Sequence, residues 1–180
     1  MSLDIKRMKQ WEKLQAIVAR DCNGAEAIMS GALAGYKYDV LDETGKLYIE
    51  CKTRETGLRV ELSWIWKLLD DMFHDNNYEI PVIIIAHSDT PEEYIACVHS
   101  KVADVGIVLP AYYGGIYNKV ERALKIKHKS FRIVSTGHPT YFNVVNIPIP
   151  KRGYIDFFIY DRKGFIDIAR QIATKGISNE

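Results

Sequence analysis

The sequence lacks any apolar run long enough to cross a membrane. The longest run extends from Pro81 to Ala86, whereas a transmembrane helix requires about 20 consecutive apolar residues. The amino-terminal stretch MSLDIKRMKQ also lacks the apolar segment of a secretory signal peptide. We therefore expect no membrane association and a cytoplasmic location.

Cysteine is scarce, and the charges nearly cancel. Cys22, Cys51 and Cys97 are odd in number and widely spaced, which favours a reduced protein over a disulfide framework. The net charge is +1, so composition alone does not indicate a nucleic-acid-binding protein. The five histidines lack the spacing of zinc ligands. With 180 residues, no internal repeat and no low-complexity linker, the chain is expected to form one domain over residues 1–180.

The basic residues are unevenly distributed along the chain. One cluster lies near the start and consists of Lys6, Arg7, Lys9 and Lys13. A second cluster consists of Lys119, Arg122, Lys125, Lys127, Lys129 and Arg132, with Glu121 as the acidic residue among them. Such clusters are either solvated helix faces or surfaces that neutralise phosphates. Both interpretations remain open from composition.

Hydrophobic periodicity predicts helices and strands in mixed order, which indicates an α/β or α+β fold with a central sheet. Helices are expected over residues 5–20, 63–76, from residue 90 onward, over 116–128 and from 165 to about 176. Gly24 is expected to end the first helix, and Thr90 with Glu93 to form a capping box around Pro91. Strands are expected in a hairpin over 36–55 and over 80–88, 105–109, 131–135, 141–147 and 154–160.

The stretch YKYDVLDETGKLYIECKTRE, from Tyr36 to Glu55, carries charged residues in the middle of predicted strands. If Thr44 and Gly45 form a two-residue turn, Asp39 lies opposite Glu50. Side chains directly opposite have Cβ atoms about 5 Å apart. Lys52 shares the face of Glu50 because strand side chains alternate. One face therefore gathers two carboxylates and an ammonium group.

Opposed carboxylates repel each other unless a proton or a cation compensates. Mg²⁺ takes oxygen ligands and is commonly held by one or two carboxylates together with water and substrate phosphate. Lys52 could then position or deprotonate an attacking water, or offset charge in a phosphorane-like transition state. A charged, solvated hairpin face is the alternative interpretation. The acid-x-Lys pattern also occurs at Asp4–Lys6 and Asp161–Lys163, but only the copy at Glu50 has an aspartate opposite it on a predicted strand.

The order of these features resembles the PD-(D/E)XK nuclease superfamily. The shared features are a helix carrying glutamate, a loop of small residues, an aspartate hairpin leading into IECK, a long helix and an apolar strand. The resemblance covers roughly residues 5–90 and is nearest to archaeal Holliday-junction resolvases and the resolvase-like nucleases of phages. It implies a restriction-endonuclease-like mixed sheet flanked by helices, with residues 91–180 as an α/β elaboration. Tyr38 stands where the family usually has proline.

The resemblance implies a role for particular residues of this chain. Asp39, Glu50 and Lys52 take the central motif, the backbone carbonyl of Cys51 is a further metal ligand, and Glu12 supports the metal from the first helix. Glu26 competes with Glu12 for that last role. The implied cofactor is Mg²⁺, which Mn²⁺ would replace.

The resemblance also implies a DNA substrate and a homodimer. The residues expected to contact DNA are Ser30, Gly31, Lys6, Arg7, Lys9, Lys13, Arg54, Lys119, Arg122 and Lys125. The expected activity is Mg²⁺-dependent endonucleolytic hydrolysis of branched DNA. Two alternatives remain: a restriction- or repair-type nuclease acting on duplex or flapped DNA, and a catalytically inactive DNA-binding protein on the same scaffold.

Overall fold

The structure of the protein is a computed structural model that describes residues 2–26, 39–55, 64, 67–68, 80–108, 132–134, 144–149 and 153–176. For residues 2–9, 103, 132–134, 144–149, 153–156 and 176 it describes the backbone alone. The predicted helix over 116–128 and most of the one over 63–76 lie outside these residues, although Trp64, Lys67 and Leu68 have helical backbone.

The first helix, α1 (Ser2–Asp21), confirms the helix predicted from residue 5. It ends in a Schellman-type turn, in which the N–H of Gly24 donates to the carbonyl of Ala19 and that of Asn23 to Arg20. Asn23, and not Gly24, adopts the left-handed conformation, with φ 51°. Gly24 is required for another reason, since a side-chain carbon there would collide with the carbonyl oxygen of Leu41.

The hairpin consists of β2 (Val40–Leu41) and β3 (Leu47–Arg54), and its register is as predicted. Val40 pairs with Ile49 and Leu41 with Tyr48. The predicted two-residue turn is wrong, however, because residues 42–46 all lie outside the ladder. The carboxylate of Asp42 accepts hydrogen bonds from the N–H groups of Thr44 and Leu47, at 3.2 and 2.7 Å. This side chain replaces the last ladder bonds, and Gly45 closes the turn with φ 68°.

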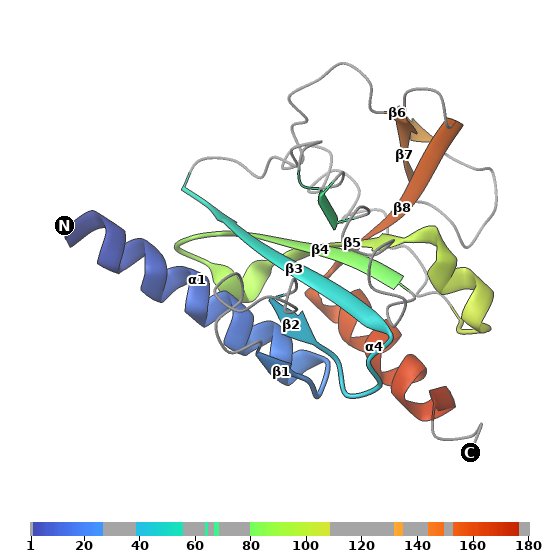
Figure 1. Cartoon of the computed structure of the whole chain (residues 1–180), viewed down its shortest axis with the longest axis horizontal. Helices are drawn as coiled ribbons and strands as arrows, with labels where there is room; N and C mark the ends of the chain where they lie inside the picture. Colours follow the sequence, from blue (N-terminus) through green and yellow to red (C-terminus); the bar gives the residue numbers. More distant parts are fainter. Residues whose placement is uncertain are drawn as a thin grey trace.

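The described strands form one mixed sheet in the order β1-β2-β3-β4-β5-β8-β7-β6 (Figure 1). The remaining strands are β1 (Ala25–Glu26), β4 (Ile80–His87), β5 (Ile95–His99), β6 (Arg132–Val134), β7 (Val144–Ile149) and β8 (Gly153–Asp161). Strands β3 and β4 are parallel, and the other described neighbours are antiparallel. This arrangement confirms the predicted mixed α/β class at a general level.

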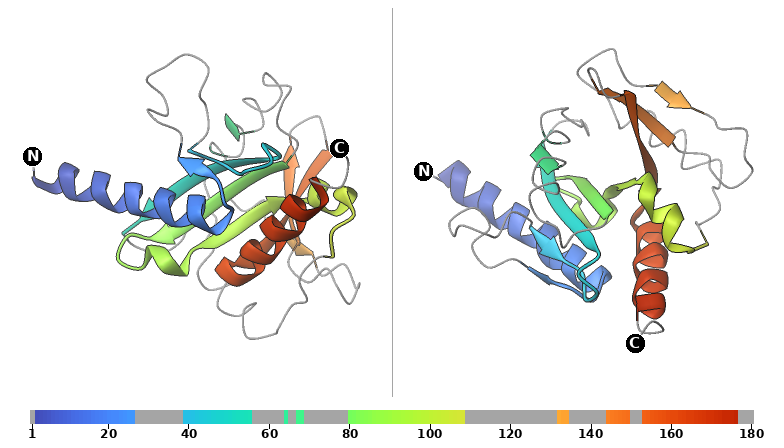
Figure 2. Two further views of the ribbon diagram at one scale, coloured as in Figure 1. Left: turned by 90° about the horizontal axis from the view of Figure 1, so that it is seen from below. Right: turned by 45° about the vertical axis from the view of Figure 1, so that its right-hand side comes forward.

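Helices α1 and α4 (Arg162–Gly176) lie on the same face of the sheet, as the views in Figures 1 and 2 show. Their apolar side chains join one core cluster with the inward residues of β2, β3, β4, β5 and β8. Helix α4 starts with a cap, because the N–H of Gly164 donates to Asp161 Oδ1 at 2.9 Å. Asp161, the acidic residue of the acid-x-Lys pattern at Asp161–Lys163, therefore has a structural role as a helix cap.

A partly buried ion pair joins the two helices. The guanidinium of Arg162 donates to both carboxylate oxygens of Asp21, from Nε at 2.7 Å and from Nη2 at 2.9 Å. The hydroxyl of Tyr94 donates to the same carboxylate at 2.8 Å. Asp21 raises the pKa of Arg162, and burial followed by the charge of Asp21 raises the pKa of the Tyr94 phenol. The start and the end of the described chain are therefore held together by a bidentate contact.

Two other predictions in this region are wrong. Residues Pro91–Glu93 form the 3₁₀ turn η1, and the side chain of Thr90 makes no capping hydrogen bond, so the expected capping box and helix are absent there. Strand β5 follows instead, because its residues alternate between the two buried faces of the sheet. The 3₁₀ segment η2 (Ser100–Val105) occupies the start of the predicted strand over 105–109, and Ile107 and Val108 are not in a strand.

No helix in the described part of the chain combines the length and the apolar character needed to cross a membrane.

Candidate functional site

Asp39 lies at the open end of the hairpin, directly before β2. Its backbone N–H donates to the carbonyl of Ile49 at 3.0 Å. Ile49 is also the ladder partner of Val40, and the described ladder ends at that pair, so the predicted pairing of Asp39 with Glu50 is not part of it. The residue is only 5% exposed, and its carboxylate accepts the N–H of Cys51 through Oδ2 at 2.7 Å. The side chain of Asp39 therefore takes the place of a ladder partner for β3.

The carbonyl of Cys51 lies on the same edge of β3 as the carboxylate of Asp39. In an antiparallel ladder, the N–H and C=O of one residue point toward the same neighbouring strand. Because the N–H of Cys51 reaches Asp39, its carbonyl also faces the end of β2. The indole Nε1 of Trp11 donates a hydrogen bond to this carbonyl at 3.3 Å. Helix α1 therefore lies against one side of the site. The Asp39 carboxylate and the Cys51 carbonyl place two possible oxygen ligands at this edge of β3.

The carboxylate of Glu50 is buried as well, with 7% of the residue exposed. The ammonium group of Lys52 forms a close ion pair with Glu50 Oε1. The ammonium of Lys67 lies 3.9 Å from the same oxygen. A buried carboxylate is costly unless it is paired. Two cations on one oxygen offset that cost and orient the carboxylate.

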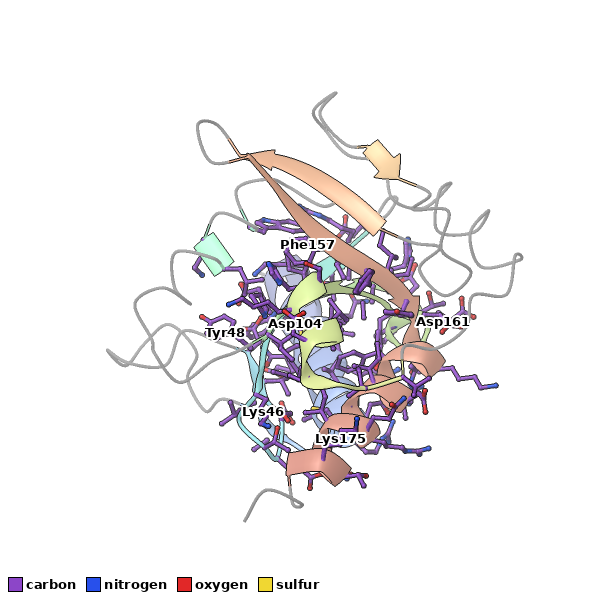
Figure 3. The ribbon with its side chains drawn as sticks, turned by 90° about the vertical axis from the view of Figure 1, so that its right-hand side faces the viewer. Lys46, Tyr48, Asp104, Phe157, Asp161 and Lys175 are labelled. Carbon is purple, nitrogen blue, oxygen red and sulfur yellow. The ribbon has the colours of Figure 1, made fainter. Side chains whose placement is uncertain are left out.

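The strand β3 presents its residues alternately to two environments. Leu47, Ile49 and Cys51 belong to the core beneath α1 and α4. Tyr48, Glu50, Lys52 and Arg54 alternate with them and occupy the other face. Figure 3 labels Lys46 at the turn and Tyr48 on β3, and the site residues follow Tyr48 along the strand. Trp64 lies over this second face, with its ring centroid 5.9 Å from Lys52 Nζ and 4.3 Å from the guanidinium carbon of Arg54.

The thiol of Cys51 is not part of the reactive surface. It points into the core, and burial, followed by the charges of Asp39 and Glu50, raises its pKa well above the ordinary value. It therefore stays protonated and is a poor nucleophile or ligand. Any contribution of Cys51 to a metal site must come from its backbone carbonyl.

The donor set fits a hard divalent cation that retains water. Asp39, Glu50 and the Cys51 carbonyl supply only oxygen atoms, which suit Mg²⁺. Within the described residues there is no group of three or more His, Cys, Asp or Glu side chains that could hold a metal. The protein would therefore supply two carboxylates and a carbonyl, with water or substrate phosphate completing the coordination.

The other residues predicted for the site lie in several parts of the chain. Glu12 is exposed on α1 beside Trp11, and its competitor Glu26 is exposed on the edge strand β1. Lys13 forms an ion pair with Glu92 at 2.6 Å. Lys6, Arg7 and Lys9 lie on the described backbone of α1. Ser30, Gly31, Lys119, Arg122 and Lys125 lie outside the described residues.

Sequence reasoning missed three contributors to this region. Trp11 lies in the predicted first helix, and its indole N–H bonds the Cys51 carbonyl. Lys67 lies in the predicted helix over 63–76, and its ammonium approaches Glu50 Oε1 at 3.9 Å. Gln15 lies one helical turn after Trp11 and is 5% exposed, and the described residues provide no hydrogen-bond partner for its Nε2. No signal in the sequence separated these residues from ordinary helix positions.

No protein-family model matches this chain, no curated protein matches it, and no solved structure matches it. Inference of function therefore depends on the residues and geometry described above.

Proposed function

We propose that the protein is a Mg²⁺-dependent endonuclease of the PD-(D/E)XK type that hydrolyses DNA phosphodiester bonds, with branched DNA of the Holliday-junction kind as its substrate. The observation that carries the proposal is the hydrogen bond from the N–H of Cys51, the residue after Glu50, to the carboxylate of Asp39. It holds the Asp39 carboxylate beside the segment of β3 that carries Glu50, the Cys51 carbonyl and Lys52, whose ammonium pairs with Glu50. A homodimer in the cytoplasm, with Mn²⁺ able to replace Mg²⁺, belongs to the same proposal.

The order of elements supports a restriction-endonuclease-like core. Helix α1 precedes the hairpin, and β3 is followed by the parallel strand β4 after residues 56–79. Parallel neighbours need a crossover connection, commonly a helix. The described elements follow the order that the resemblance implies, and Trp64, Lys67 and Leu68, which lie between β3 and β4, have helical backbone. Strands β5 to β8 and helix α4 then form the elaboration over residues 91–180.

Each residue of the site has a distinct part in the proposed reaction. Asp39, Glu50 and the Cys51 carbonyl would hold Mg²⁺, with Glu12 in support from α1. When bound, the ion would act as a Lewis acid toward the phosphate and the attacking water. Lys52 would orient that water and offset the negative charge that develops on phosphorus. The water oxygen bonds to phosphorus and releases a proton to solvent while the opposite ester bond breaks, and the leaving oxygen takes a proton from solvent.

Cleavage assays test this proposal directly. Four-way junctions, flapped duplexes and plain duplexes would be incubated with Mg²⁺ and with wild-type, Asp39→Asn and Lys52→Ala protein. We expect cleavage of the junction by the wild type and at least about a hundredfold slower cleavage by each variant, the scale typical of lost electrostatic catalysis. Lys101→Ala, which removes an exposed lysine from η2, is the matched control. The proposal fails if both site variants cut as fast as the wild type. Preferential cutting of duplex or flap would instead favour the restriction- or repair-type alternative.

One observation favours a second candidate, a DNA-binding protein without nuclease activity. The ammonium groups of Lys52 and Lys67 both lie close to Glu50 Oε1. Among the described residues, no third acidic side chain joins Asp39 and Glu50 in a group that could hold a metal. Such a protein would bind DNA tightly and with strong salt dependence but would yield no Mg²⁺-dependent product. The same assays distinguish it from the nuclease.

A further inference from the structure

Lys67 belongs to a segment that covers the second face of β3. Trp64, Lys67 and Leu68 have helical backbone, and residues three apart on a helix share one face. The Trp64 ring centroid lies 5.9 Å from Lys52 Nζ. Three residues later, the Lys67 ammonium lies 3.9 Å from Glu50 Oε1. The segment therefore brings a second lysine to one of the proposed metal ligands.

The oxygen atom that Lys67 approaches is also the partner of Lys52. The Lys52 ammonium forms a close ion pair with Glu50 Oε1, and the two side chains are 27% and 9% exposed. The side chain of Lys67 is 65% exposed. An ammonium group on a flexible stem in solvent can exchange its partner at little cost. Lys67 is therefore the cation that leaves Glu50 most easily.

Lys67 lies where it would meet both a divalent cation and the phosphate bound to that ion. A divalent cation at Glu50 and an ammonium group about 4 Å away repel each other. The oxygen ligands of one Mg²⁺ ion lie within about 4 Å of one another, because each is about 2.1 Å from the ion. Lys67 Nζ is 3.9 Å from one of the proposed ligands. It is therefore within reach of a phosphate oxygen held by the same ion.

We propose that Lys67 competes with the divalent cation for Glu50 and exchanges that carboxylate for a phosphate oxygen of the DNA when the ion is bound. This inference rests on the proposed nuclease function for its cation and its substrate. The buried carboxylate of Glu50 keeps a cationic partner before and after the exchange, so its charge stays compensated. Lys67 then adds a second ammonium group, beside that of Lys52, at the phosphate where negative charge develops.

Manganese affinity measured without DNA tests the competition. Titration calorimetry with Mn²⁺ would compare the wild type, Lys67→Met, Lys67→Arg and the matched control Lys101→Met, which makes the same change at an exposed lysine of η2. Lys67→Met removes the charge and keeps an unbranched side chain. It should bind Mn²⁺ about fivefold more tightly than the wild type, the effect of one unit charge about 4 Å away in water. Lys67→Arg and Lys101→Met should bind Mn²⁺ within about twofold of the wild type, since the local charge is unchanged.

DNA binding with and without a divalent ion tests the exchange. Fluorescence anisotropy would follow a labelled four-way junction in EDTA and in saturating Ca²⁺, which also takes oxygen ligands, with gels to check that the DNA stays intact. In EDTA, Lys67→Met should bind the junction within about threefold of the wild type, because Glu50 then holds the lysine. In Ca²⁺ it should bind about tenfold more weakly, as for a lost hydrogen bond to a charged group. Lys67→Arg should restore most of that affinity.

The two effects of Lys67→Met have opposite signs, which an ion pair with only a structural role would not produce. With saturating Mg²⁺, kcat/KM for junction cleavage should fall about tenfold, although the variant binds Mn²⁺ more tightly. Thermal melting of each variant identifies any loss that comes from unfolding. Because the side chain of Lys67 is mostly exposed, we expect the variants to melt with the wild type.

Several outcomes would overturn the inference. Mn²⁺ affinity that is unchanged or weaker in Lys67→Met would show that Lys67 does not compete for Glu50. Equal junction binding by the wild type and Lys67→Met in Ca²⁺ would show that Lys67 contacts no phosphate. If the wild type cuts DNA and Lys67→Met matches it in every assay, the nuclease proposal stands and this inference fails. If Lys67→Met shows both effects while the wild type cuts no DNA, the inference stands and the nuclease proposal fails. Mn²⁺ binding by neither protein would overturn both.

Discussion

The indole N–H of Trp11 donates a hydrogen bond to the carbonyl oxygen of Cys51 at 3.3 Å. This contact joins α1 to the strand that carries Glu50 and Lys52. A carbonyl oxygen has two lone pairs, so it can accept the indole and still coordinate a cation. Trp11 therefore orients a proposed ligand in the way that outer hydrogen bonds orient metal ligands generally.

Trp11→Phe removes this hydrogen bond and keeps most of the packing. We expect the free energy of unfolding to fall by about 0.5–1.5 kcal/mol, as for an ordinary hydrogen bond. We also expect Mn²⁺ affinity to fall about tenfold, because outer-shell hydrogen bonds commonly contribute 10- to 100-fold. Chemical denaturation and Mn²⁺ titration measure the two effects. Unchanged Mn²⁺ affinity in a folded variant would show that the indole only packs.

The hairpin register was predictable from the sequence, because strand side chains alternate and Gly45 marks the turn. The loop length was not, because the Asp42 carboxylate replaces ladder bonds with its own hydrogen bonds to Thr44 and Leu47. The burial of both faces of β4 could also be predicted, because its apolar run is unbroken.

Contacts between residues that lie far apart in the sequence were not predicted. The Asp21–Arg162 pair joins residues 141 positions apart, and the contact of Lys67 with Glu50 joins two residues 17 positions apart. Strand β5 was missed because a plausible capping pattern at Thr90 and Glu93 favoured a helix, whereas pairing with both β4 and β8 stabilises a strand. Tertiary pairing here outweighed a local helix signal.

Gln15 carries a buried amide nitrogen for which the described part of the chain provides no hydrogen-bond partner. Replacing it with methionine, which has a similar shape and no donor, should leave stability unchanged or raise it by about 1–2 kcal/mol, because an unpaired buried polar group is removed. Gln15→Ala should destabilise the protein, since it leaves a cavity. Urea denaturation of both variants tests this. A marked loss of stability in Gln15→Met would mean that the amide has a partner in solution.

The Asp21–Arg162 pair should contribute substantially to stability. Arg162→Ala leaves the Asp21 carboxylate buried with Tyr94 as its remaining donor. We expect a loss of about 2–3 kcal/mol, below the range for fully buried pairs because the side chain of Arg162 is 30% exposed. Lys13→Ala breaks the exposed pair with Glu92 and should change stability much less, because solvent screens that pair. Equal effects of the two substitutions on the unfolding midpoint would contradict this ranking.

The buried thiols should make stability fall in alkaline solution. Burial raises the pKa of the Cys97 thiol to about 12, and burial with the charge of Asp42 raises that of Cys22 to about 12. An unfolded thiol ionises near pH 8.5, so the unfolded state loses its proton first. Each thiol's contribution is therefore complete below about pH 8.5 and is lost as the pH rises toward 12.

Cys97→Ala isolates one of these contributions. Between pH 9 and pH 10.5, the free energy of unfolding of the wild type should fall more steeply than that of the variant, by about 1.4 kcal/mol per pH unit. Denaturation at several pH values measures both slopes. Parallel slopes would show that Cys97 ionises equally easily in both states.

Mn²⁺-soaked crystals, measured for anomalous diffraction, test the metal site most directly. We predict one anomalous peak about 2.1 Å from oxygen atoms of Asp39 and Glu50 and from the Cys51 carbonyl, and its loss in Asp39→Asn crystals. A well-ordered crystal soaked in millimolar Mn²⁺ with no peak between these groups, or with an equal peak in Asp39→Asn, would contradict the proposed site.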